Sequence, residues 1–78
     1  MTNLQRIRKK IGLTQKELAE LSGVNLRMIQ KYEAGEKNIN HAQVVTVFRL
    51  AFAVGVPLFD ILELNEKTVQ ELAEIIAN

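Results

Sequence analysis

The chain has 78 residues, of which 47% are apolar, and it carries no cysteine and a net charge of +1 at neutral pH. This length supplies one compact domain with one core, because so short a chain buries only about 60% of the surface that it exposes when unfolded. The lack of cysteine excludes a disulfide framework, thiolate metal sites and redox chemistry, so packing alone must hold the core together. No secretory signal peptide or membrane span is predicted, and a cytoplasmic location is expected.

The charges are distributed unevenly along the chain. Residues 1–41 carry eight Lys or Arg against four Glu, a balance of +4, whereas residues 42–78 carry two basic against five acidic residues, a balance of −3. A basic N-terminal half is expected if its surface faces phosphates, and an acidic C-terminal half would orient that surface toward DNA. Ordinary charge scatter on a small domain is the alternative, so the motifs must decide.

Apolar residues recur at helical spacing throughout, which predicts an all-α domain. The first helix is expected over Asn3–Ile11, with Gly12 as its stop. Its inward face carries Leu4, Ile7, Ile11 and the charged Arg8. A second helix begins after Thr14, which has the spacing of a reciprocal capping pair with Glu17. The inward residues of this second helix are expected to be Leu18, Ala19 and Leu21.

A tight turn joins the second helix to a third one, expected over Leu26–Ala34. Gly23 can take the positive φ angle that ends a helix abruptly, and Asn25 can cap the next helix. Ala19 lets the two helices approach closely, and Ile29 fills the wedge between them. Together these residues predict a helix-turn-helix.

The third helix presents a polar outer face. With Ile29 inward, Arg27 and Lys31 point outward one turn apart, and Met28 and Gln30 flank them. In the DNA major groove, Arg or Lys can donate to guanine, Gln can pair with adenine, and apolar groups can contact thymine methyls. The face therefore suits base reading, although an ordinary solvated surface has the same polarity.

Arg8 and Glu33 both fall on inward faces of their helices, where an unpaired charge is costly. We therefore predict an ion pair that ties the first helix to the base of the third. The planar guanidinium of arginine suits the bidentate geometry of such a pair better than lysine does.

Three more helices are expected beyond a polar loop at residues 36–39, over Ala42–Val54, over Leu58–Leu62, and from the cap Asn65 to about Ala77. Asn40 and Gln43 make a plausible capping pair for the first of these, and Pro57 suits the first turn of the second. The predicted helix-turn-helix domain therefore covers residues 1–64, and residues 65–78 form a C-terminal helix.

The segment LTQKELAELSGVNLRMIQKYEAGEKNI resembles the helix-turn-helix core of Cro and lambda-repressor type regulators, the XRE family. The resemblance covers about residues 4–62, because RLAFAVGVPLFDIL is similar to that family's fourth and fifth helices. It implies a compact five-helix, lambda-repressor-like bundle with a short sixth helix added at the C-terminus. It also implies a sequence-specific transcriptional regulator, most simply a repressor, that binds double-stranded DNA as a homodimer.

The resemblance further implies roles for individual residues. The groove-facing residues would be Asn25, Leu26, Arg27, Met28, Gln30 and Lys31. Gln15, at the start of the second helix, would bind a phosphate and approach a base, and the positive N-terminus of that helix could hold another phosphate. The loop residues that would contact the sugar-phosphate backbone are Lys37, Asn38 and Asn40.

Two apolar stripes lie outside this arrangement. The fourth helix carries Val45, Phe48 and Phe52, and the family often has charged residues at the first and last of these positions. The C-terminal helix carries the stripe Val69, Leu72, Ala73 and Ile76. This helix can pack on its own domain or form a dimer seam, for which the candidate residues are Phe52, Val69, Leu72 and Ile76. Both arrangements stay open.

No residue pattern indicates catalysis. His41 is the only histidine, with no base or nucleophile spaced near it, and the four glycines follow helices rather than forming a phosphate-binding loop. We therefore expect no enzymatic activity, no metal and no cofactor. The alternative function is a protein-interaction module, antitoxin-like, that would hold a protein partner through the fourth and C-terminal helices.

Overall fold

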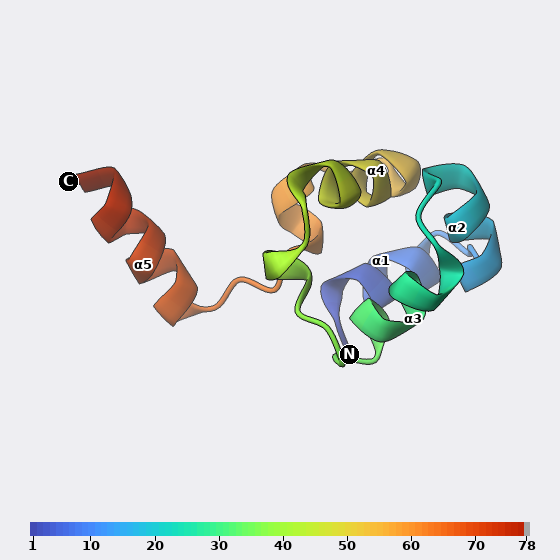
Figure 1. Ribbon diagram of the computed structural model, residues 1–78, viewed down its shortest axis with the longest axis horizontal. Coiled ribbons are helices and arrows are strands. Elements are labelled where there is room, and N and C mark those ends of the chain that lie inside the picture. The colour runs from blue at the N-terminus through green and yellow to red at the C-terminus, as the bar shows by residue number, and fades with distance from the viewer. Residues whose placement is uncertain (78) are drawn as a thin grey trace.

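Residues 1–77 fold into helices joined by loops. In chain order the elements are α1 (Asn3–Lys10), α2 (Gln15–Ser22), α3 (Leu26–Glu33), the 3-10 helix η1 (Ile39–His41), α4 (Val44–Val54), the 3-10 helix η2 (Leu58–Ile61) and α5 (Glu66–Ala77) (Figure 1). The computed structural model describes residues 1–77 but not the side chains of Leu72, Ile76 and Ala77, so the expected places of Leu72 and Ile76 in an apolar stripe lie outside the described residues. No strand occurs among residues 1–77, which confirms the all-α prediction. No helix in this part of the chain is long and apolar enough to cross a membrane.

One core holds the elements from α1 to η2 together. Its largest fully buried side chains come one from each of α1, α2, α3, α4 and η2, and they are Leu4, Leu18, Ile29, Leu50 and Ile61. Burial of each such side chain contributes about 1.5–3 kcal/mol relative to its exposure. Ile29 is therefore a core residue of α3, as the sequence predicts, and it anchors this helix at its centre.

Local capping sets the ends of α2 and the start of α3. The hydroxyl of Thr14 accepts from the N–H of Glu17 at 3.0 Å, and the Glu17 carboxylate accepts from the N–H of Thr14 at 2.9 Å, which confirms the capping pair. Gly23 ends α2 with φ +72°, in the left-handed region that favours glycine. Asn25 then caps α3 by accepting from the N–H of Arg27 at 2.8 Å.

Two apolar residues expected on inward faces are exposed instead. Ile11 lies just beyond α1, which ends at Lys10, and its side chain is 48% exposed. Leu21 is 64% exposed, because Ser22 takes the buried position at the end of α2. A buried serine is tolerated there because its hydroxyl accepts a hydrogen bond from the N–H of Val24 at 3.1 Å. α3 ends at Glu33, one residue before the expected Ala34.

The expected cap of the fourth helix by Asn40 and Gln43 is wrong. α4 begins at Val44 rather than Ala42, and no side chain caps it. Asn40 instead holds the backbone of Glu63, whose carbonyl accepts from Nδ2 and whose N–H donates to Oδ1, both at 2.8 Å. Two hydrogen bonds to a partly buried backbone stabilise more than one local cap, so the side chain turns toward Glu63.

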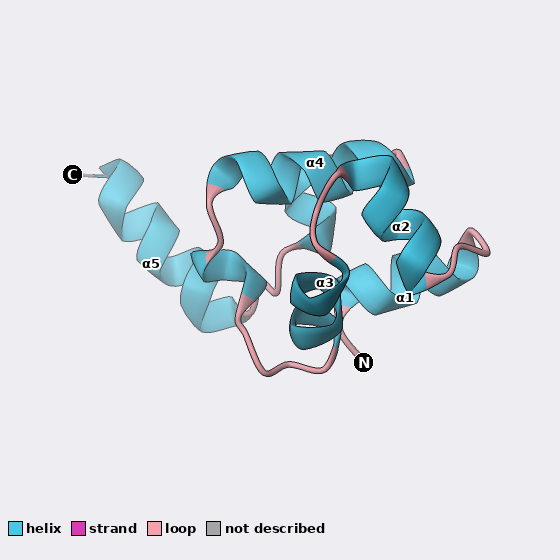
Figure 2. Cartoon of the chain, turned by 45° about the vertical axis from the view of Figure 1, so that its right-hand side comes forward, coloured by secondary structure: helices cyan, strands magenta, loops and turns pink. Residues whose placement is uncertain are grey.

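The C-terminal helix α5 stands away from the other elements, and the molecule measures 41 Å along its longest axis against 20 Å along the other two (Figures 1 and 2). Its cap is the expected one, because Oδ1 of Asn65 accepts from the N–H of Thr68 at 2.9 Å. Val69 and Ile75 are 53% and 72% exposed. As described, α5 therefore leaves the apolar stripe of α4 uncovered in its own chain.

Candidate nucleic-acid interface

The helix-turn-helix consists of α2 and α3, joined through residues 23–25 (Figure 2). On one side of α3, Ile29, Tyr32 and Glu33 are buried. On the other side, Arg27 and Gln30 are exposed to solvent. The core thus clamps α3 along one face and leaves the opposite face available to a ligand.

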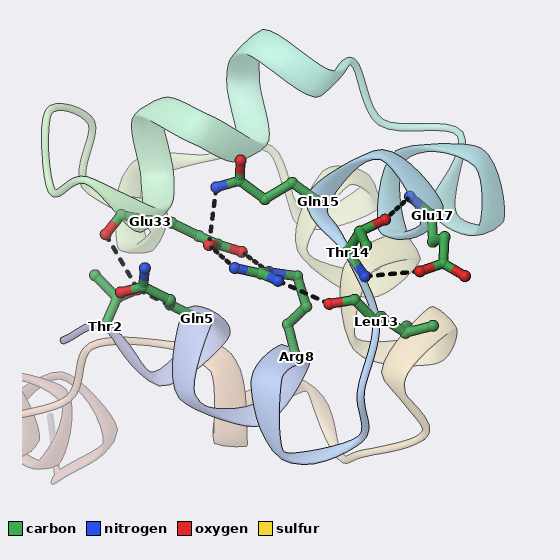
Figure 3. A network of polar contacts seen from close by, with 8 residues as sticks. All are labelled: Thr2, Gln5, Arg8, Leu13, Thr14, Gln15, Glu17 and Glu33. Atoms are coloured by element: carbon green, nitrogen blue, oxygen red, sulfur yellow. Dashed lines mark hydrogen bonds and ion pairs between the residues drawn. The ribbon is translucent and has the colours of Figure 1, made fainter.

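A buried ion pair fixes α3 to α1, as the sequence predicts (Figure 3). Nε of Arg8 donates to Oε2 of Glu33 at 2.7 Å, and Nη2 donates to Oε1 at 2.8 Å, so the contact is bidentate. The two side chains are only 9% and 2% exposed. Hydrogen bonding to the Glu33 carboxylate raises the pKa of Arg8 above its ordinary value, and burial opposes this effect. The guanidinium of Arg8 therefore stays charged at neutral pH.

Two further hydrogen bonds extend this network to the start of α2. Nη1 of Arg8 donates to the carbonyl of Leu13 at 2.7 Å, and Nε2 of Gln15 donates to Oε1 of Glu33 at 3.0 Å (Figure 3). Gln15 is consequently half-buried and held at the first position of α2. Its amide retains a second N–H and its carbonyl oxygen for a ligand.

Glu17 places a negative charge at the N-terminus of α2. Hydrogen bonds from the backbone and the side chain of Thr14 lower the pKa of this carboxyl below its ordinary value, and the positive end of the helix also favours the ionised form. The capping pair is therefore fully formed at neutral pH. It keeps the first turn of α2, and with it Gln15, in helical geometry.

α3 exposes only part of the predicted reading surface. Arg27 and Gln30 are exposed, and Leu26 is 36% exposed at the start of the helix. Lys31 is half-buried, and Met28 is half-buried and packs against the core. A shallow hollow on this side is lined by Arg27, Gln30, Lys31, Ala34 and Glu36. The outward face is thus centred on Arg27 and Gln30 rather than on Arg27 and Lys31.

The loop after α3 carries the residues expected to touch the DNA backbone. Lys37 is exposed, and its N–H donates to the carbonyl of Lys31 at 3.3 Å, which ties the loop to the end of α3. Asn38 is exposed and caps η1 by accepting from the N–H of Asn40 at 2.9 Å. The Asn40 side chain is already bonded to Glu63. Lys37 is therefore the most available of the three side chains.

Two contributions to this surface were not predicted from the sequence. Glu36 adds a carboxylate to the hollow beside Arg27, and only its position directly after Gly35 could have drawn attention to it. The carbonyl of Leu13 supports Arg8. No sequence signal marks such a contact, because every residue type carries the same backbone acceptor.

Comparison with known proteins identifies the family. A family model described as helix-turn-helix matches residues 4–61, which is more than half of the chain and extends from α1 to the end of η2. The chain is 31% identical over 67 residues to an uncharacterized HTH-type transcriptional regulator of Sinorhizobium fredii, and the alignment covers 86% of this chain and 83% of that relative. No solved structure matches the chain at a significant level. The resemblance seen in the sequence is confirmed, and the chain belongs to the XRE-type helix-turn-helix family of DNA-binding transcriptional regulators.

Proposed function

We propose that this protein represses transcription by binding a specific double-stranded DNA site as a homodimer and reading the major groove with α3. The observation that carries this proposal is the exposure of Arg27 and Gln30 on a helix whose opposite face is buried. Arginine suits the O6 and N7 acceptors of guanine, and glutamine suits the N6 and N7 groups of adenine. Because the bidentate contact of Glu33 with Arg8 fixes α3, both reading side chains are presented at a constant position.

Phosphate contacts would position α3 in the groove without reading sequence. Lys37 lies in the loop directly after α3 and supplies a positive charge, while the N-terminus of α2 and the amide of Gln15 supply N–H donors. Neutralised phosphates release counterions, so this part of the affinity falls as salt rises. The contact of Lys37 should therefore depend on salt, whereas the contact of Arg27 should depend on the base sequence.

The small DNA contact that one such module makes supports the proposed homodimer. One such module covers only roughly 600–1,000 Å² of DNA, and proteins of this architecture gain specificity from two half-sites about one helical turn apart. A dimer bound across such a site would exclude other proteins from the same stretch of DNA, which is the simplest route to repression.

The direct test is selection of bound sites from random duplex DNA at two salt concentrations. We expect enrichment of an inverted repeat with half-sites roughly 10 bp apart, and loss of that enrichment for Arg27→Ala. Arg6→Ala is a matched control, because Arg6 is also exposed but lines a groove with Val54 and Phe59 instead of lying on α3. Failure to enrich any site, with no binding even at low salt, would contradict the proposal.

A protein-interaction module is the second candidate function, and the exposed phenylalanines of α4 favour it. Phe48 and Phe52 are 58% and 77% exposed. If this function alone applied, Arg27→Ala and Lys31→Ala would leave the biological activity of the protein intact, whereas Phe52→Asp would abolish it. DNA reading predicts losses from the two α3 substitutions.

A further inference from the structure

α4 carries an uncovered apolar surface, which we name the α4 stripe and define by Val45, Phe48 and Phe52. These side chains are 54%, 58% and 77% exposed. The rings of the two phenylalanines stack with centroids 6.0 Å apart and planes inclined by 25°. The core side of the same helix is formed by Val47, Leu50, Ala51 and Val54. A contiguous apolar surface opposite the core marks an interaction site rather than a packing requirement of the domain.

α5 is the second surface without a cover. Val69 and Ala73 are exposed and lie one turn apart on the same face of this helix. α5 has 12 residues and α4 has 11, so both are about 17–18 Å long. The two helices therefore match in length, and each exposes apolar side chains.

The exit of α5 from the bundle is fixed by two asparagines. Nδ2 of Asn3 donates to the carbonyl of Leu62 at 2.8 Å, and the N–H of Asn3 donates to the carboxylate of Glu63 at 2.6 Å. Asn40 holds both backbone groups of Glu63. We call these four hydrogen bonds the clamp. Only Leu64 and Asn65 separate the clamp from α5, and two residues span at most about 7 Å. The clamp therefore fixes where α5 begins, and α5 extends away from the other helices in Figures 1 and 2.

Charge selects the partner of each surface. Arg49 is the one charged residue of α4, which gives that helix a charge of +1. α5 carries three Glu and one Lys, a net charge of −2. Two α4 helices facing each other would bring like charges together, and so would two α5 helices. The pairing of α4 with α5 brings opposite charges together and is favoured.

We infer that two copies of this chain exchange their C-terminal helices, so that α5 of each copy lies on the α4 stripe of the other. A two-fold axis makes this contact twice. The exposed parts of the four phenylalanines alone would bury roughly 400–700 Å², since a phenylalanine buries about 150–250 Å² in full. Burial of Val45, Val69 and Ala73 adds to this area, and a specific interface requires roughly 1,000 Å² in all. The inference rests on the homodimer of the proposed function and names its surfaces.

The exchange is tested by disulfide trapping, because the natural chain has no cysteine. Chains carrying Val45→Cys, Phe48→Cys or Phe52→Cys are mixed with differently sized, tagged chains carrying Val69→Cys and oxidised mildly without DNA. We expect a covalent dimer of the two different chains in at least one mixture, well above the level given by the exposed control Lys9→Cys. Dimers of like chains only, or no product above that control, would overturn the exchange. Closure of both cysteines within one doubly substituted chain would overturn it as well.

The oligomeric state gives an independent readout. Sedimentation velocity without DNA should show a dimer, and Phe52→Asp should weaken it by roughly tenfold or more. Phe59→Asp is the matched control, because Phe59 is 64% exposed but lies in η2, outside the α4 stripe, and it should leave the dimer intact. A monomer at all concentrations would overturn the inference. Because neither measurement includes DNA, this failure is distinguishable from a failure of site selection, which would instead contradict base reading by α3.

Discussion

Arg8 and Glu33 are the residues whose contact fixes α3 to α1. Their bidentate contact is buried, and both partners make a further hydrogen bond, Arg8 to the carbonyl of Leu13 and Glu33 to the amide of Gln15. The charges are therefore paired and hydrogen-bonded, which is the condition under which buried ions are tolerated. The pairing was predictable because two opposite charges on inward faces must find each other, whereas the role of Leu13 was not.

Removing one partner of this pair should be strongly destabilising. Arg8→Met leaves the Glu33 carboxylate buried without its main partner, and we expect a loss of about 3–5 kcal/mol in the free energy of unfolding. The double substitution of Arg8→Met with Glu33→Leu should cost less than the single one, because no charge is then left unpaired. Urea denaturation measures both. A loss below about 1 kcal/mol for Arg8→Met would show that the pair does not hold α3.

Glu17 should make the stability of α2 depend on pH in the acid range. Its folded pKa lies below the ordinary value of 4.5, so the unfolded chain binds the proton more tightly. Its contribution is therefore complete above pH 4.5 and is lost as the pH falls through the lowered value. The Thr14 amide donates to the Glu17 carboxylate, so its NMR resonance should shift as this carboxyl is titrated. Glu17→Gln, which keeps the acceptor oxygen, should lack this step, and an unchanged titration of Thr14 in that variant would contradict the assignment.

For the individual helices, features that depend on neighbouring residues were predictable from the sequence, and features that depend on contacts between distant residues were not. The cap of α2 and the turn at Gly23 depend on residues within one turn of each other, so their spacing in the sequence was sufficient. The exposure of Leu21 was missed because Leu21 and Ser22 lie 100° apart on the helix, and a serine with a local hydrogen bond can be buried in place of a leucine. Asn40 was misassigned because its partner, Glu63, is 23 positions away.

Gly23 should be sensitive to any side chain. A Cβ added there would meet no atom within 4 Å, so the penalty of Gly23→Ala comes from the left-handed backbone alone. We expect a loss of about 1–2 kcal/mol, seen as a lower midpoint in thermal unfolding. Gly23→Asn should cost less, because asparagine visits this conformation more readily. Equal stability of the alanine variant and the natural chain would mean that the turn adopts another conformation.

The Asn40 clamp should control the segment before α5. Asn40→Ala removes both hydrogen bonds to the Glu63 backbone, and we expect a loss of about 1–3 kcal/mol together with faster hydrogen exchange at the Glu63 amide. Asn40→Asp keeps an acceptor for that amide but loses the donor, so its stability and its Glu63 exchange rate should lie between those of the natural chain and Asn40→Ala. Unchanged exchange at Glu63 in the alanine variant would contradict the clamp. If Asn40 instead mainly bound phosphate, Asn40→Ala would weaken DNA binding without changing this exchange rate.

At the scale of the whole molecule, the bundle from α1 to η2 was predictable and the placement of α5 was not. Five elements each contribute one fully buried residue to a single core, and helical periodicity indicated Leu4, Leu18 and Ile29 of the first three helices as inward-facing. The direction of α5 depends on the contacts of Asn3 and Asn40 with residues 62 and 63, which no local pattern shows. The exposure of Arg27 and Gln30 on α3 agrees with the sequence prediction, whereas the half-burial of Met28 and Lys31 depends on packing against the rest of the domain.

In the proposed complex, Arg27 on α3 reads a base, whereas Lys37 only positions the domain on the DNA. To distinguish these two roles, we would measure the affinity of Arg27→Ala and Lys37→Ala for the selected site and for each of its single-base variants, at several salt concentrations. Arg27→Ala should lose about 1–3 kcal/mol and become indifferent to the base at one position, whereas Lys37→Ala should weaken binding to all sites equally and reduce the salt slope by about 1. A uniform loss of affinity across all sites for Arg27→Ala would show that Arg27 does not read a base.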